Sequence, residues 1–277
     1  MARQNRSRWR LIVSLPAPGA WNMAVDEAIL ESVGCGEVEP TLRLYSWEPA
    51  SISIGYAQSI ADVDFNQLNL NGWQIVRRPT GGRAILHIDE LTYSVIGAYS
   101  EPRLAGSVLE SYQRLSTALL TALQTLGISA QALAKDKPST AGVNPNPVCF
   151  EVPSDYEITF QGRKLIGSAQ ARRKDGVLQH GSLPLFGDLR RITQVLHFPD
   201  EDARKTAALR LLDRAITVEG MLGHQVPWDI AARAVSEAFQ STLDIEFSQQ
   251  DLSRVEETRA QELVVKKYAS STWTNRV

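Results

Sequence analysis

The stretch that decides the fold is residues 156–185, YEITFQGRKLIGSAQARRKDGVLQHGSLPL. Apolar and polar residues alternate over Tyr156–Phe160 and Lys164–Ala169, and the Gln161-Gly162 pair between these segments is typical of a hairpin turn. Asp175-Gly176 marks a second hairpin turn. Two hairpins in succession predict neighbouring antiparallel strands. On this alternation, Lys164 shares a face with Ile166 and Ser168.

Short β-rich segments also alternate with helical ones before this stretch. We expect strands at 9–15, 41–47, 51–56, 73–78, 84–87 and 91–98, and helices at 22–33 and 108–126. Gly34 and Gly127 follow the two helices, as glycine often does at a helix C-terminus. The regular strand–helix–strand repeat of a Rossmann fold is missing. The sequence therefore predicts an α+β fold with a mixed or antiparallel sheet packed with helices.

The character of the chain changes after about residue 187. The segments 200–213, 228–240 and 249–268 read as helices rich in Ala, Glu, Arg and Gln. The length of 277 residues suits one large domain or one domain with an appendage. We expect a catalytic domain over about 1–190 and a mostly helical C-terminal part over 191–277.

Composition excludes several classes of protein. The net charge of −2 gives no general attraction to nucleic acid or to an anionic membrane. No apolar run approaches the roughly 20 residues of a membrane span, and the apolar stretch 11–15 is shorter than the ~7–15 residues of a secretory signal core. Cys35 and Cys149 have no paired spacing, which fits a reducing compartment. We expect a cytoplasmic protein that binds neither nucleic acid nor membrane.

The loop Arg77-Arg78-Pro79-Thr80-Gly81-Gly82-Arg83 lies between two expected strands. Gly81 and Gly82 would let the backbone approach a ligand closely. The three arginines would hold an anion such as a phosphate or carboxylate, or else they are solvated side chains of a tight turn. The loop has neither a Walker A pattern nor a dinucleotide-binding glycine pattern.

His87 lies close to Asp89 and Glu90. Because no second His or Cys follows at a metal-ligand spacing, we expect no metal site. His87 is expected to hydrogen-bond neighbouring backbone and to shape a pocket rather than to transfer a proton.

Cys149 follows a loop rich in Pro and Asn at 135–148. It is either a small buried apolar side chain or a nucleophile. A nearby cation such as Lys164 would lower the pKa of its thiol and enrich the reactive thiolate. Lys164 could equally be a solvated charge at a strand edge, since spacing in the sequence does not bring the two together.

Small residues interrupt two of the expected strands. One strand carries Gly167, Ser168 and Ala169, and the next carries His180 and Gly181. Together with the Thr80-Gly81-Gly82 loop, they would line a narrow slot with a polar mouth. Such a slot suits an extended apolar chain.

In this order, the motifs resemble the lipoate-protein ligase and octanoyltransferase superfamily over about residues 9–225. The resemblance is carried by the blocks Trp21–Ala28, Arg77–Ala84 with His87, Gly162–Gln170 and Gln179–Ser182. The segments Cys149-Phe150, Pro153-Ser154, Tyr156-Glu157 and Glu90–Ser94 are similar to LipM-type octanoyltransferases. Ile88 departs from relatives that have an acidic residue after the histidine, which argues against an essential carboxylate there.

The resemblance implies the fold of class II biotin and lipoate protein ligases with a small helical C-terminal extension. It implies transfer of an octanoyl group from octanoyl-acyl carrier protein to a lysine of a lipoyl domain, such as glycine cleavage H protein or a dehydrogenase E2, without a cofactor. Cys149 would form a thioester and Lys164 would activate chemistry at the acyl carbonyl. The three arginines would guide the acidic carrier. The expected substrate-binding residues are Arg77, Thr80, Gly81, Gly82, His87, Gly167, Ser168, Ala169, His180 and Gly181.

Three alternatives remain at this level. An ATP-dependent lipoate-protein ligase would hold an acyl adenylate in the same slot. An amidotransferase would move octanoate between two lipoyl proteins. A non-catalytic lipoyl-domain or acyl-binding module would keep the fold without chemistry.

Overall fold

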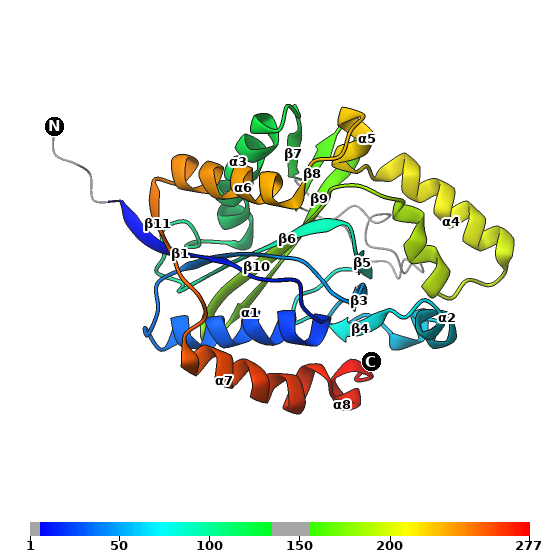
Figure 1. Ribbon diagram of the computed structural model, residues 1–277, viewed down its shortest axis with the longest axis horizontal. Helices are drawn as coiled ribbons and strands as arrows, with labels where there is room; N and C mark the ends of the chain where they lie inside the picture. The colour runs from blue at the N-terminus through cyan, green and yellow to red at the C-terminus, as the bar shows by residue number, and fades with distance from the viewer. Residues whose placement is uncertain (1–5, 135–155) are drawn as a thin grey trace.

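The computed structural model describes residues 6–134 and 156–277, and its centre is an eight-stranded sheet (Figure 1). The strand order is β11-β1-β2-β6-β10-β9-β8-β7. A smaller sheet has the order β4-β3-β5. The strands are β1 (Ser7–Val13), β2 (Thr41–Tyr45), β3 (Ser51–Ile54), β4 (Gln74–Arg77), β5 (Ile85–His87), β6 (Glu90–Gly97), β7 (Gln131–Ala134), β8 (Tyr156–Phe160), β9 (Arg163–Arg173), β10 (Gly176–Pro184) and β11 (Ile245–Gln249).

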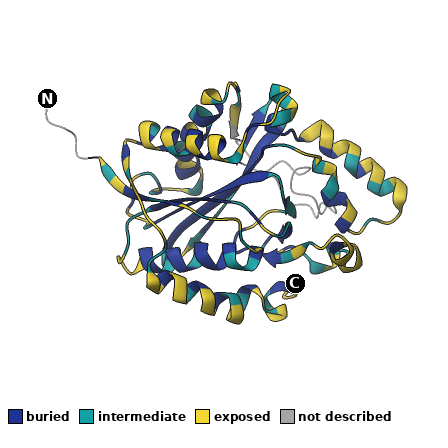
Figure 2. Ribbon diagram, viewed as in Figure 1, coloured by how far each residue is buried: buried dark blue, intermediate teal, exposed yellow. Residues whose placement is uncertain are grey.

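Helices cover both faces of the large sheet (Figure 1). They are α1 (Gly19–Gly34), α2 (Phe65–Leu70), α3 (Val108–Thr125), α4 (Glu201–Arg214), α5 (Val218–Leu222), α6 (Trp228–Thr242), α7 (Arg254–Leu263) and α8 (Ser271–Thr274), with the short helical turns η1 (Ile60–Asp62), η3 (Leu189–Val195) and η4 (Val264–Tyr268). The pair α3 and α6 packs on one face, and α1 packs on the other with α7 behind it. Figure 2 shows the sheet and the inner side of α1 buried, while α4 and α7 are largely exposed.

The predicted α+β class is confirmed. β1 pairs in parallel with β2 and β11, and the other strand pairs of the large sheet are antiparallel. Both predicted hairpins form, and they share one long strand, β9. Every residue of the central strand β6 is buried, because helices cover both of its faces.

The C-terminal segment differs from the expected secondary structure. The strand β11 (Ile245–Gln249) was not predicted, and Gln249 was assigned to a helix. The helix α7 begins only at Arg254, where Ser253 forms a capping box with Glu256. Since β11 extends the large sheet beyond β1, the C-terminal part contributes to the same sheet as the first strands. The domain division at about residue 190 stays a prediction.

A buried ion pair ties this C-terminal segment to the sheet. The Arg10 guanidinium on β1 donates to both Glu256 carboxylate oxygens, at 3.0 and 2.6 Å. The two side chains are 3% and 0% exposed. A bidentate pair of this kind fixes direction as well as distance, so it sets the position of α7 relative to β1.

No helix in the described parts of the chain combines the length and the apolar character that crossing a membrane would require.

Candidate active site

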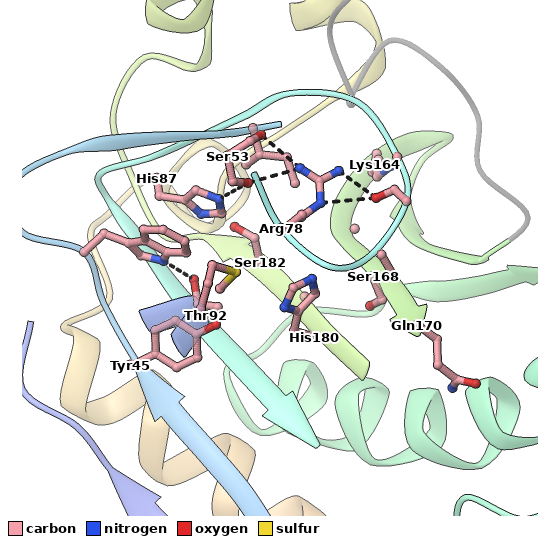
Figure 3. A pocket seen from close by; sticks show the side chains of 18 residues that line it. Tyr45, Ser53, Arg78, His87, Thr92, Lys164, Ser168, Gln170, His180 and Ser182 are labelled. Atoms are coloured by element: carbon pink, nitrogen blue, oxygen red, sulfur yellow. Dashed lines mark hydrogen bonds between the residues drawn. The ribbon is translucent and has the colours of Figure 1, made fainter. Parts of the chain in front are cut away.

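A cavity of about 360 Å³ opens where the large sheet meets the small one (Figure 3). This volume lies within the roughly 300–1,000 Å³ typical of small-ligand pockets. Lys164 and Tyr45 lie at opposite ends of the group of lining side chains in Figure 3. The lining residues are Met23, Tyr45, Trp47, Ser53, Arg78, Gly81, Gly82, Ile85, His87, Thr92, Lys164, Gly167, Ser168, Ala169, Gln170, His180, Gly181 and Ser182.

The Gly81-Gly82 loop is held against this cavity by Arg78. The Arg78 guanidinium donates to the carbonyl of Gly81 at 2.8 and 3.1 Å and to that of Arg83 at 2.8 Å, and it also donates to Ser53 on β3. Gly82 has a φ of +94°, a conformation that side-chain-bearing residues avoid. Arg78 is therefore a clamp for the loop and not a solvated turn residue.

Arg77 does not reach the cavity. Its side chain is fully buried and points toward the C-terminal segment, where it donates to the carbonyl of Thr274 at 2.7 and 2.9 Å. It also donates to the carbonyls of Gly55, Tyr56 and Gln58. The Arg77 guanidinium thus binds backbone carbonyl groups and not the phosphate or carboxylate that the sequence suggested. Burial lowers the pKa of the Arg77 guanidinium, and the Arg276 charge lowers it further.

His87 belongs to a buried polar cluster that lines the cavity. Its Nε2 lies 2.7 Å from Ser53 Oγ and its Nδ1 lies 2.5 Å from Glu90 Oε1. Its ring stacks on Trp47 with centroids 3.9 Å apart. The expected partner was neighbouring backbone, but these partners are side chains. His87 itself lies in the wall of the pocket.

Glu90 is the centre of this cluster and was not among the predicted site residues. Besides His87, it accepts hydrogen bonds from Thr92 Oγ1 at 2.5 Å and from Ser182 Oγ. The available signal was a carboxylate at the start of a strand that has no other charged residue, since a buried carboxylate needs donors around it. His87 and Thr92 lie close to Glu90 in the sequence, but Ser182 comes from β10, which only the fold brings beside β6.

His180 joins the loop to a second buried network. Its Nε2 lies 2.6 Å from Thr80 Oγ1, and its Nδ1 lies 3.7 Å from Asp26 Oδ2. Burial is the main cause that lowers the pKa of His180; the Arg78 and His87 charges add to it and Asp26 opposes it. The imidazole is therefore neutral near pH 7.

Asp26 remains ionised in this network. Burial alone would raise the pKa of its carboxyl, but the nearby His180 imidazole and the Arg43 guanidinium outweigh burial and hold the pKa below its ordinary value. Tyr45 Oη and Ser94 Oγ also donate to Asp26, at 3.0 and 2.9 Å. A charged group thus lies directly behind Tyr45 and His180 in the cavity wall.

Lys164 lies on the cavity side of β9 because of a β-bulge. Thr159 is paired with Lys164 and Ile158 with Ile166, which leaves Leu165 as an extra residue. The prediction that Lys164 and Ile166 share a face is therefore wrong. Ile166 packs in the core beside α3 and α6.

Ser168 lies on the core face with Ile166. Its Oγ is 2.7 Å from Tyr93 Oη, and Tyr93 is part of the same core. Ser168 still borders the cavity where the strand passes it.

The structure brings most of the predicted site residues together. Nine line the cavity: Gly81, Gly82, His87, Lys164, Gly167, Ser168, Ala169, His180 and Gly181. Thr80 is buried directly behind the loop, in contact with His180. Arg77 lies elsewhere, and Cys149, with Phe150, Pro153, Ser154 and the loop 135–148, lies outside the described residues.

The chain is similar to known proteins in its sequence. Residues 18–240 match the family described as the lipoyl protein ligase A/B catalytic domain. The chain is 39% identical over 276 residues to octanoyltransferase LipM of Brevibacillus brevis, covering 97% of this chain and 99% of that protein. It is 38% identical over 271 residues to octanoyltransferase LipM of Kyrpidia tusciae, covering 97% and 98%.

A solved structure supports the fold. The bi-partite lipoate protein ligase of Thermoplasma acidophilum aligns over 98% of both chains, with a TM-score of 0.81 and 27% identity. The predicted ligase-like fold is confirmed. The chain therefore belongs to the lipoyl protein ligase A/B catalytic domain family and, within it, to the LipM octanoyltransferases.

Proposed function

We propose that this chain transfers an octanoyl group from octanoyl-acyl carrier protein to a lysine of a lipoyl domain, through a thioester on Cys149. The observation that carries the proposal is the cavity itself, a slot of about 360 Å³ with the Lys164 amine at one end. The acyl carbonyl would lie near Lys164, with the alkyl chain extending toward Met23 and Tyr45. Both of these side chains are buried.

The reaction proceeds in two exchanges. In the first, the Cys149 thiolate attacks the carbonyl of the donor thioester, the bond from carbon to the carrier sulfur breaks, and the carrier leaves as a thiol after taking a proton. In the second, the neutral amine of the acceptor lysine attacks the enzyme thioester. The bond to Cys149 breaks, an amide forms, and the proton lost by the amine returns to the thiol.

The residues of the cavity support both exchanges. The Lys164 ammonium stabilises the thiolate, as cations near cysteines do. Backbone N–H groups of the Gly81-Gly82 loop stabilise the carbonyl oxygen while it carries negative charge. The donor is already an activated thioester, so the reaction requires no nucleotide and no cofactor. The acceptor is a lipoyl domain of the H-protein or dehydrogenase E2 kind.

Intact-mass spectrometry tests the proposal. After incubation with octanoyl-acyl carrier protein and no nucleotide, the wild-type chain should carry one octanoyl adduct that hydroxylamine removes. Cys149→Ser should abolish this adduct. The matched control is Cys35→Ser, because Cys35 is exposed at the end of α1 and should be irrelevant to the chemistry. An undiminished adduct on Cys149→Ser would refute Cys149 as the nucleophile.

Changing the donor separates the alternatives. Modification of the lipoyl domain only with free octanoate and ATP would identify a ligase. Transfer only from an octanoylated lipoyl protein would identify an amidotransferase. Tight binding of the donor without adduct or turnover would identify a binding module.

A further inference from the structure

A carboxylate stands directly beside the Lys164 amine. Lys164 Nζ donates a hydrogen bond to Glu157 Oε1 at 2.9 Å, and the two side chains are 3% and 12% exposed. Lys164 lines the cavity, and Glu157 lies beside it on the neighbouring strand β8. We propose that Glu157 is a positioning residue for octanoyl transfer, which holds the Lys164 ammonium at its end of the cavity; this inference rests on the proposed function.

Three features of the backbone converge on this one pair. The bulge at Leu165 puts Lys164 on the cavity face. The residue opposite Glu157 in the strand register is Gly167. A Cβ at Gly167 would lie 2.8 Å from Lys164 Cε and 3.3 Å from Nζ. The missing side chain therefore leaves the space in which the lysine crosses toward Glu157.

The pair is well shielded from water, so its interaction exceeds that of a surface ion pair. Charge-assisted hydrogen bonds are about twice as strong as neutral ones, and a carboxylate within about 4–6 Å favours the charged form of an amine. Glu157 thus keeps Lys164 charged and in one place. The positive charge of Lys164 stabilises a thiolate, and the fixed position of the amine makes this stabilisation effective.

Glu157 is in direct contact with the Lys164 amine. The described titratable groups on the surrounding elements carry both signs. They are Arg163 on β9, Arg78 after β4, His87 on β5, Glu90 on β6, His180 on β10, and Asp213 and Arg214 at the end of α4, where Ala215 bridges Lys164. Because a carboxylate in contact favours the charged form of an amine, removing the Glu157 charge should disfavour the charged form of Lys164.

Substitution of Glu157 by its isostere tests this role. Glu157→Gln should lower kcat for acyl transfer at least about tenfold, as expected when a group in the site loses its fixed position, with KM within about twofold. The limb of the pH–rate profile that reports Lys164 should move to lower pH, because the ammonium loses its partner. Glu157→Asp should recover part of the rate. The matched control is Glu262→Gln, which removes a carboxylate paired with Lys266 on the exposed side of the C-terminal helices and should change none of these quantities.

A double variant separates positioning from a general effect on the fold. If Glu157 acts through Lys164, then Glu157→Gln should cost nothing further in a Lys164→Ala background. An equal loss in both backgrounds, or a wild-type rate for Glu157→Gln alone, overturns the proposal.

A readout that does not need turnover completes the test. An amine-reactive reagent modifies Lys164, and peptide mass spectrometry follows this modification as a function of pH. The midpoint should shift to lower pH in Glu157→Gln. If that variant does not fold, Glu157→Asp should show a smaller shift in the same direction. An unshifted midpoint contradicts the inference. If the wild-type chain transfers no octanoate, the proposed function fails, while this reagent still decides whether Glu157 holds Lys164.

Discussion

The Arg43 guanidinium and the Asp26 carboxylate form an ion pair that is completely shielded from solvent behind the cavity. Arg43 Nη1 lies 2.8 Å from Asp26 Oδ1, and both side chains are 0% exposed. Arg43 also donates to the backbone and side-chain oxygens of Asn22 and packs over the Tyr45 ring. The position of α1 relative to β2 is therefore fixed by charge as well as by apolar packing.

Removal of the Asp26 charge should be strongly destabilising. Asp26→Asn leaves the Arg43 guanidinium buried without its counter-ion, which costs about 3–5 kcal/mol in comparable pairs. Urea unfolding measures the loss. Asp188→Asn is the control, because its pair with Arg190 is exposed and is worth at most about 1 kcal/mol. Equal losses for the two variants would contradict the role assigned to burial.

Glu256 should make stability depend on pH in the acid range. Burial opposes ionisation, but the Arg10 hydrogen bond and the Ser253 backbone outweigh it and lower the pKa of Glu256. Its stabilisation is thus fully present above the ordinary value near 4.3 and is lost as pH falls through the lowered native value. The difference in unfolding free energy between wild type and Glu256→Gln should shrink as pH falls below about 4. A constant difference down to pH 2 would contradict this.

A methyl group at Gly167 should impair transfer more than folding. In Gly167→Ala the new Cβ would displace the far end of the Lys164 side chain, which is flexible, so the fold can adapt. We expect acyl transfer to fall at least about tenfold while the unfolding free energy changes by about 1 kcal/mol or less. The control is Gly220→Ala on α5, where the nearest atoms lie 3.3 Å away, outside the cavity. Full activity in Gly167→Ala would show that Lys164 needs no fixed place.

Arg77 should contribute to stability and not to capture of the acidic donor. Arg77→Met should cost at least about 3 kcal/mol, because several buried carbonyls lose a charged donor. The salt dependence of donor capture should stay as in wild type, since a buried charge is a poor guide for a diffusing partner. A flattened salt dependence in a stable variant would restore the steering role first expected for Arg77.

The sequence predicted the fold class well because turn and periodicity signals are local. Gln161-Gly162 and Asp175-Gly176 identify both hairpins, and the period of α3 is clear. β11 was missed because its apolar alternation is limited to Ile245 and Phe247, and so short a segment becomes a strand only by pairing with β1. Such pairing over a long sequence distance leaves no local signal.

The sequence identified most residues of the candidate site, but not the side chains that they contact. The small residues of β9 and β10 and the loop at 80–82 were identified because a narrow slot requires residues without bulky side chains. The contact of His87 with Ser53 was not found, because Ser53 lies on β3, 34 positions away, and its proximity to Glu90 in the sequence did not show that the two side chains are buried together. Lys164 was predicted to share a face of β9 with Ile166, but it lies on the opposite face. One extra residue in β9 reverses the alternation on which the prediction depended.

The pairing of β1 with β11 also bears on how the chain folds during its synthesis. Arg10 and its partner Glu256 are 246 positions apart. At about 5–20 residues per second, a ribosome needs roughly 12–50 s to make the residues between them. Throughout that interval β1 has β2 on one side and an open edge on the other. Unpaired edges of this kind invite association with other chains, so the nascent protein is most exposed to aggregation just before its last helices emerge.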